Sequence, residues 1–273
     1  MAATTLRHPA VAGRFYPNDP EDLRAEVRNY TFLVPAQRPA RAFGCIVPHA
    51  GYMYSGHVAG AVFARLEIPE RCIVLSPNHT GVGHALAIMS EGEWETPLGR
   101  VPIDAPLAAS LKQGCPLLHE DSDAHHAEHA IEVELPFLQV LQPKLRFVPI
   151  TLGTWHFEAL EQLGFALAET IRANNEPVLV VASSDMNHYE SDAVTRVKDG
   201  KAIERILALD ARGLHHVVTQ QHVSMCGFGP AIAAITAAKI LGAQSAELVK
   251  YATSGDISGD RDLVVGYAGV FFQ

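Results

Sequence analysis

Residues 43–56 read FGCIVPHAGYMYSG, a short apolar run that leads straight into a loop carrying a histidine. Similar short, β-branched runs recur along the chain and alternate with longer segments whose apolar residues repeat at helical spacing. This alternation is typical of parallel strands joined by crossover helices. The sequence therefore predicts an α/β fold with a mainly parallel or mixed central sheet and helices on both faces.

The predicted strands cover residues 43–47, 72–76, 85–89, 146–150, 178–183, 247–253 and 264–272. Helices are predicted over 58–66, 157–171, 194–209 and 230–241, and another begins at Asp19, an N-cap followed by Pro20. Residues 128–141 alternate like a strand, and Pro136 would interrupt either element, but a helix is the preferred interpretation. Because no linker or repeat divides the chain, residues 1–273 are expected to form a single domain.

Composition limits the classes of function. The formal charge is −9, and no basic run provides the footprint of a nucleic-acid-binding protein. The longest uncharged stretch contains histidines and several glycines, so no membrane span is expected. The first residues lack the apolar core of a secretory signal, and the four cysteines form no CxxC pair. These features predict a cytoplasmic protein with reduced cysteines.

Three histidines follow predicted strands directly. His49 follows the first strand, His79 follows the second, and His188 follows the strand at 178–183. Ligands of open α/β sheets bind beyond the carboxyl ends of the strands, so these imidazoles should meet at one edge. Cys226 precedes the predicted helix at 230–241, where the helix dipole would favour a thiolate. Imidazole and thiolate suit zinc, iron or copper, which indicates a metal pocket.

Several longer motifs together resemble one family. They are AGRFYP at 12–17, VPHAGYMYSG at 47–56, SPNHT at 76–80, EHAIEVELPFL at 128–138, SSDMNHY at 183–189 and MCGFGP at 225–230. In this order they resemble the Memo family, including its prokaryotic branch, AmmeMemoRadiSam system protein B. The resemblance implies a fold shared with class III extradiol dioxygenases, which are non-haem iron enzymes. It also implies functional association with AMMECR-type and radical SAM proteins.

The resemblance implies a role for each pocket residue. The metal ligands would be His49, His79 and Cys226, and the catalytic group would be His188, Asp185 and His129. In this group His188 would act as general acid/base and Asp185 would orient His188 or a bound water. His129 would lie behind the ligands or face the substrate.

Cys226 stands where the dioxygenases carry a carboxylate. The metal is therefore expected to be divalent, with Fe(II) favoured and Cu or Zn possible.

Tyr54 and Phe15 are the predicted substrate-binding residues. Tyr54 shares a motif with His49, and its hydroxyl could donate to a ligand. Phe15 occupies a position that can be Trp in animal relatives, where the pocket rim is implicated in binding a phosphotyrosine peptide. A small molecule or a peptide is therefore the expected ligand of the metal pocket.

Three functions remain open from the sequence. The first is a metal-dependent, dioxygenase-like oxidoreductase acting on a small molecule. The second is a non-catalytic protein that senses metal or redox state or binds a peptide. The third is a zinc-dependent hydrolase, because His125, Glu128 and His129 spell the H-x-x-E-H signature. A simpler interpretation makes His125 and His126 solvent-facing residues of an acidic loop.

Overall fold

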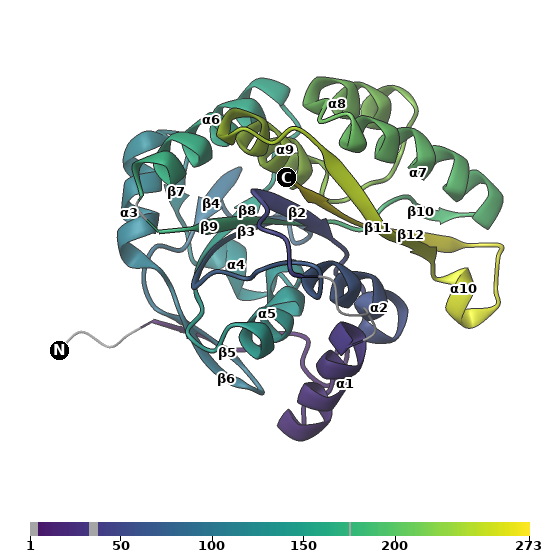
Figure 1. Cartoon of the computed structure of the whole chain (residues 1–273), viewed down its shortest axis with the longest axis horizontal. Coiled ribbons are helices and arrows are strands. Elements are labelled where there is room, and N and C mark those ends of the chain that lie inside the picture. The colour runs from purple at the N-terminus through teal and green to yellow at the C-terminus, as the bar shows by residue number, and fades with distance from the viewer. Residues whose placement is uncertain (1–4, 33–37, 175) are drawn as a thin grey trace.

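A nine-stranded mixed sheet forms the centre of the computed structural model, which describes residues 5–32, 38–174 and 176–273 (Figure 1). Its middle consists of four parallel neighbours in the order β2 (Gly44–Val47), β9 (Val178–Ser183), β3 (Arg71–Pro77) and β8 (Arg146–Leu152). Antiparallel strands flank them, with β12 (Val264–Phe272) beside β2 and β4 (Leu86–Ile88) beside β8. The remaining strands are β10 (His188–Glu190) and β11 (Ala246–Thr253), which pair with β12, and β7 (His119–Glu120), which pairs with β4. The predicted sheet with a parallel centre is confirmed.

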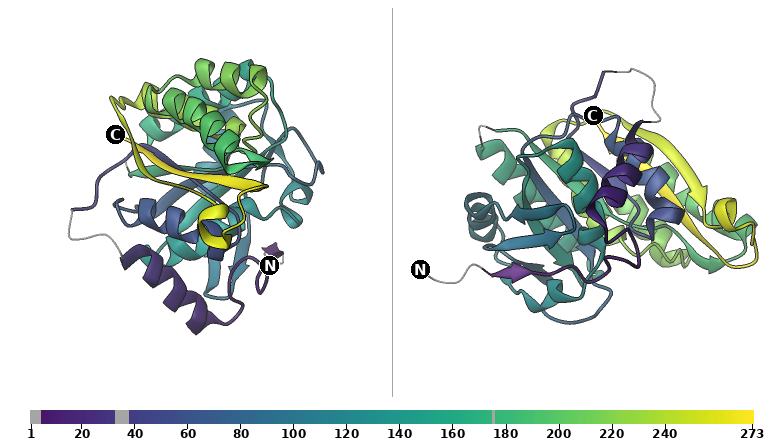
Figure 2. Two further views of the ribbon diagram at one scale, coloured as in Figure 1. Left: turned by 90° about the vertical axis from the view of Figure 1, so that its right-hand side faces the viewer. Right: turned by 90° about the horizontal axis from the view of Figure 1, so that it is seen from below.

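Helices cover both faces of this sheet (Figure 1, Figure 2). One face carries α3 (Ala105–Gly114), α6 (Phe157–Ala173) and α9 (Phe228–Leu241), with α7 (Asp192–Leu207) and α8 (Ala211–Gln220) packed beside them. The other face carries α1 (Pro20–Phe32), α2 (Tyr52–Phe63) and α5 (Ala130–Leu141). Two single-turn helices, α4 (Asp123–His126) and α10 (Gly255–Ser258), lie in connections.

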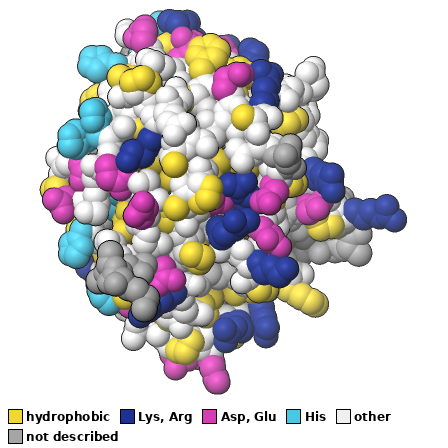
Figure 3. All heavy atoms as spheres, turned by 90° about the vertical axis from the view of Figure 1, so that its left-hand side faces the viewer, with side chains coloured by type: hydrophobic (Ala, Val, Ile, Leu, Met, Phe, Trp, Pro, Cys, Tyr) yellow, Lys and Arg dark blue, Asp and Glu magenta, His cyan; other side chains and the backbone are white. Residues whose placement is uncertain are grey.

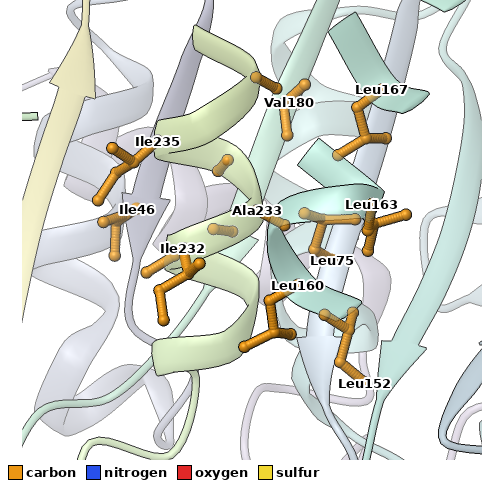
Figure 4. Close-up of a cluster of buried hydrophobic side chains, with 14 of the residues drawn as sticks. Ile46, Leu75, Leu152, Leu160, Leu163, Leu167, Val180, Ile232, Ala233 and Ile235 are labelled. Atoms are coloured by element: carbon orange, nitrogen blue, oxygen red, sulfur yellow. The ribbon is translucent and has the colours of Figure 1, made fainter. Parts of the chain in front are cut away.

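Alternating side chains of the central strands enter two separate cores, because successive residues of a strand point to opposite faces. Ile46, Leu75 and Val180 pack under α6 and α9, as Figure 4 shows. Their neighbours Cys45 and Val74 lie in the opposite core, under α2 and α5. Burial on both faces explains why these strands read as continuous apolar runs.

A second sheet, of three strands, was not predicted from the sequence. It joins β1 (Leu6–Arg7), β5 (Glu93–Thr96) and β6 (Gly99–Pro102), which are short and partly polar. One buried carboxylate ties the N-terminal segment to α5: Glu132 pairs with Arg7 and accepts hydrogen bonds from the Val11 backbone N–H at 3.0 Å and the Tyr16 hydroxyl at 2.6 Å. The segment that carries Phe15 is thereby held against the main body.

Of the predicted helices, α2 departs most from its predicted bounds, and α5 is the one whose sequence also alternates like a strand. Helix α2 begins at Tyr52, six residues before the predicted start, because Gly51 and Tyr52 already turn the chain after His49. Helix α5 does contain Pro136, and its residues from Ala130 to Leu138 are all buried. Tertiary packing therefore outweighs the local cost of the proline. The predicted N-cap of α1 is confirmed, since Asp19 Oδ1 accepts the backbone N–H of Glu21 at 2.8 Å.

Candidate metal centre

The loops that follow β2, β3 and β9 form the site. His49 and His79 each lie two residues beyond their strand, and His188 opens β10 shortly after β9. Since β2, β9 and β3 are parallel neighbours, all three loops leave the sheet at the same edge, as predicted. Figure 3 shows histidine side chains at the surface along one margin of the molecule; the buried ring of His49 is not seen in such a view.

Three imidazoles converge at this edge. His49, His79 and His129 each offer one ring nitrogen, and these atoms lie within 4.8 Å of one another. The rings of His79 and His129 stack with centroids 4.7 Å apart, and His49 stands edge-on to both. His129 was expected behind the ligands or facing substrate, but its ring belongs to the group that could hold a metal. A set of imidazole nitrogens suits a first-row divalent ion.

Hydrogen bonds fix the tautomer of buried His49. Its Nδ1 lies 2.8 Å from Ser183 Oγ, which also lies 3.0 Å from the carbonyl of Ala130 and 2.8 Å from Glu134 Oε1. The serine hydroxyl has one proton and two other acceptors for it, so His49 Nδ1 is the donor. Nε2 then carries the free lone pair. Burial lowers the pKa of His49 well below its usual range, and the neighbouring imidazoles add to this effect.

Glu128 orients His79 in the same way. Its buried carboxylate accepts His79 Nδ1–H at 2.9 Å and the His79 backbone N–H at 2.6 Å. It also accepts the backbone N–H groups of His129 at 2.9 Å and Ala130 at 3.0 Å. Burial lowers the pKa of His79, but the hydrogen bond and charge of Glu128 outweigh it, so the pKa is raised. A carboxylate on Nδ1 leaves Nε2 for a metal, as in many metalloproteins.

Cys226 lies beside this group. Its Sγ is 3.3 Å from His49 Nε2, close to the roughly 3.5 Å that separates two ligands of one tetrahedral ion. Burial raises the pKa of the thiol well above its usual range, and the nearby Asp185 charge adds to this. Burial thus outweighs the start of α9, which was predicted to favour a thiolate. A metal at Cys226 would have to displace the thiol proton.

His188 is held by a residue that the sequence did not single out. Its backbone N–H donates to Ser224 Oγ at 2.8 Å, and its Nδ1 lies 2.9 Å from the Ser224 carbonyl oxygen. Asp185 was expected to orient His188 or a water, yet its carboxylate accepts the backbone N–H of His49 at 2.9 Å. Burial raises the pKa of Asp185 to about 6, against the opposing effect of His188. Asp185 thus ties the β9 loop to the β2 loop.

The two predicted substrate residues lie on different walls. The Phe15 ring packs edge-on against His129 with centroids 4.9 Å apart, and its carbonyl accepts the Tyr52 N–H at 2.7 Å. Tyr54 is half-buried and packs against Val58 and Tyr267. Phe15 therefore contacts the imidazole group directly, whereas the contacts of Tyr54 are with the small cluster around Val58 and Tyr267.

The zinc-hydrolase motif does not assemble. Helix α4 ends at His126 and α5 starts at Ala130, so His125 and His129 are not on successive turns of one helix. His125 is buried rather than solvent-facing, because its ring packs against Trp94 and its Nδ1 contacts Thr151 Oγ1 at 3.0 Å. Burial lowers the pKa of His125 to about 4. The hydrolase alternative is therefore set aside.

Replacing Glu128 by glutamine should weaken metal binding about 10- to 100-fold, the usual effect of losing a residue that orients a ligand. Glutamine has a single accepting oxygen, so it can accept either the His79 Nδ1–H or the His79 backbone N–H, and its NH₂ would face the other donor. Competition with a chromophoric chelator would measure the affinity. Glu95→Gln is a matched control, since Glu95 pairs with His8 at the surface. An unchanged affinity in Glu128→Gln would show that this carboxylate does not prepare the site.

Comparisons with known proteins agree on one family. A family model described as Memo-like protein matches residues 7–271. A MEMO1 family protein of Methanopyrus kandleri is 44% identical over 280 residues, covering 98% of this chain and 99% of the relative. A MEMO1 family protein of Methanothermobacter thermautotrophicus is 42% identical and covers 96% of this chain and 99% of its own length.

Among the solved structures that match, one is similar in fold, at a sequence identity too low to show more than the fold. The crystal structure of the uncharacterized protein JW3007 from Escherichia coli K12 superimposes with a TM-score of 0.53 at 14% identity. It covers 83% of this chain and 99% of that protein.

Among the described residues, no helix has both the length and the apolar character needed to cross a membrane.

Proposed function

The chain belongs to the Memo family, and we propose that it binds one divalent metal, with Fe(II) favoured, and uses it to oxidise a small molecule with dioxygen. The convergence of His49, His79 and His129 carries this proposal. Their donor set fits a metal because His49 and His79 each give Nδ1 to a fixed partner and keep Nε2 free. Cys226, next to His49, would supply a further donor.

When bound, the metal would supply Lewis acidity and a place where substrate and dioxygen meet. The protein's own groups would do the remaining work. Asp185 fixes the position of His49 through the backbone, and Ser224 fixes His188. His188 is half-buried, and in this proposal its imidazole would give a proton to the substrate oxygen or take one from it. Phe15 covers the cluster from the N-terminal side.

Anaerobic reconstitution with Fe(II), followed by elemental analysis, tests the metal part of the proposal. We expect one iron per chain. Dioxygen uptake by the loaded protein with a panel of small molecules tests the oxidation. Stoichiometric iron without substrate-dependent uptake would favour a non-catalytic metal-sensing or peptide-binding protein.

For the variant His188→Ala we expect unchanged iron content and turnover reduced about 100-fold or more, the typical contribution of a general acid/base. The metal should remain because His188 is not among the three grouped imidazoles. His126→Ala, which removes an exposed histidine, is the control. Equal turnover in parent and His188→Ala would remove His188 from the mechanism.

A further inference from the structure

A groove of about 520 Å³ opens beside the imidazole group of His49, His79 and His129. His79 and Cys226 line it where it meets the cluster. The rest of its wall comes from the loops after β3 and β8 and from the start of α9, including Trp155, Phe228 and Pro230. Its volume lies within the range of sites that hold a small organic molecule. A ligand in this groove would reach the imidazole group at one end.

Trp155 is the most unusual residue of this groove. Its side chain is 75% exposed, in the short connection between β8 and α6. The connection is anchored, since the Trp155 carbonyl accepts the ring N–H of His215 on α8 at 3.0 Å. Phe228 stands edge-on to the indole with centroids 6.3 Å apart. An exposed indole on an anchored backbone at a groove offers a prepared face for stacking.

The groove is nearly free of charge. Among the described residues that line it, none is Lys, Arg, Asp or Glu. Its two ring-bearing ionisable residues are already paired, His79 with Glu128 and His84 with Asp121. Away from the imidazole end, where a bound metal ion would attract an anion, a phosphate would therefore lose water without gaining a cationic partner. This wall selects for an uncharged ligand.

We propose that the groove binds an uncharged, flat aromatic compound, stacked against Trp155. Its polar end would reach the metal, and in this respect the inference rests on the proposed function. The aromatic contact of Trp155 is thus a determinant of specificity rather than of metal binding.

Titration of the Fe(II)-loaded and metal-free protein with 2-naphthol, followed through the indole N–H signals in heteronuclear NMR, tests this inference. The chain has two tryptophans, and Trp94 is fully buried, so the two signals report on different places. We expect a saturable shift of the Trp155 signal. In the metal-free protein, binding should be at least about 10-fold weaker for 2-naphthyl phosphate, which carries the same rings and a charge, and it should be weaker for phenol, which offers less surface for stacking.

Trp155→Ala should weaken 2-naphthol binding by up to about 10-fold, whereas Trp155→Phe should change it only about 3-fold or less. Iron content should equal that of the parent in both variants. Phe165→Ala removes another exposed aromatic side chain, from α6, and should change nothing. Tighter binding of the phosphate by the metal-free protein, a shift confined to Trp94, or equal affinity in Trp155→Ala would each overturn the inference. If the parent takes up no iron but 2-naphthol still shifts Trp155, the groove stands and the proposed metal function fails.

Discussion

The variant His129→Ala is expected to lose stoichiometric Fe(II), with affinity reduced by more than about 100-fold. Loss of a residue that only orients a ligand costs 10- to 100-fold, and loss of a ligand should exceed that. The ring nitrogen of His129 lies within 4.8 Å of those of His49 and His79, and its ring stacks on His79. Elemental analysis after anaerobic reconstitution, supported by chelator competition, would measure the loss.

Two further variants separate the possible ligand sets. His126→Ala removes an exposed imidazole from the segment between β7 and α5 and should bind iron like the parent. Cys226→Ser should also weaken binding if the thiol completes the set, since Sγ lies 3.3 Å from His49 Nε2. Full iron in His129→Ala together with its loss in Cys226→Ser would contradict the three-histidine group. That result would return the site to His49, His79 and Cys226.

The sheet and the edge that carries the site could be predicted because strong local signals determine them. Strands buried on both faces read as unbroken apolar runs, so β9 and β12 were predicted at their observed bounds. Histidines directly after β2 and β3 had to meet, since parallel neighbours end at the same edge. The short strands β1, β5 and β6 carry no such signal.

Which histidines form the imidazole group depended on tertiary structure. His129 enters it because the chain breaks between α4 and α5, and that break turns His125 inward against Trp94. Nothing in the spacing of H-x-x-E-H distinguishes a broken helix from a continuous one. The sequence indicated Glu128 only as part of that motif. One of its partners, His79, is distant in the sequence, and the other is a backbone N–H group at the start of α5, which no side-chain pattern reveals.

Ser183 and Ser224 show a second limit. Both hold histidines of the candidate site, Ser183 through His49 Nδ1 and Ser224 through the backbone and ring of His188. A serine in a loop carries no pattern that announces such a role. Ser183 at least belongs to the SSDMNHY motif at 183–189, whereas Ser224 offered no comparable signal.

Asp199→Asn should stabilise the protein near neutral pH and flatten its dependence on pH. Asp199 is fully buried on α7, where its Oδ1 accepts the Asn187 N–H at 2.8 Å and its Oδ2 accepts the Tyr251 hydroxyl at 2.7 Å. Burial raises the pKa of this carboxyl to about 7, against the opposing hydrogen bonds and Arg196. The folded state therefore prefers the neutral acid, whereas the unfolded chain ionises near pH 4.

The sign of the effect follows from this difference. The contribution of Asp199 to stability is fully present below the unfolded pKa and is lost as pH rises through about 7. The pKa difference corresponds to roughly 4 kcal/mol in the free energy of unfolding, most of it lost between about pH 4 and pH 7. Asparagine keeps an oxygen for the Asn187 N–H and cannot ionise, so the variant should avoid this loss.

Urea unfolding of parent and Asp199→Asn at several pH values from about 5 to 8 would measure the difference. The advantage of the variant should grow with pH and level off above about pH 7. Asp262→Asn, which removes an exposed carboxylate, controls for the change in net charge. An advantage that is constant with pH would show that Asp199 is already ionised in the fold. Hydrogen bonds through Asn187 and Ser224 link Asp199 to His188. If Asp199→Asn keeps the iron content of the parent, its effect on stability does not act through the metal centre.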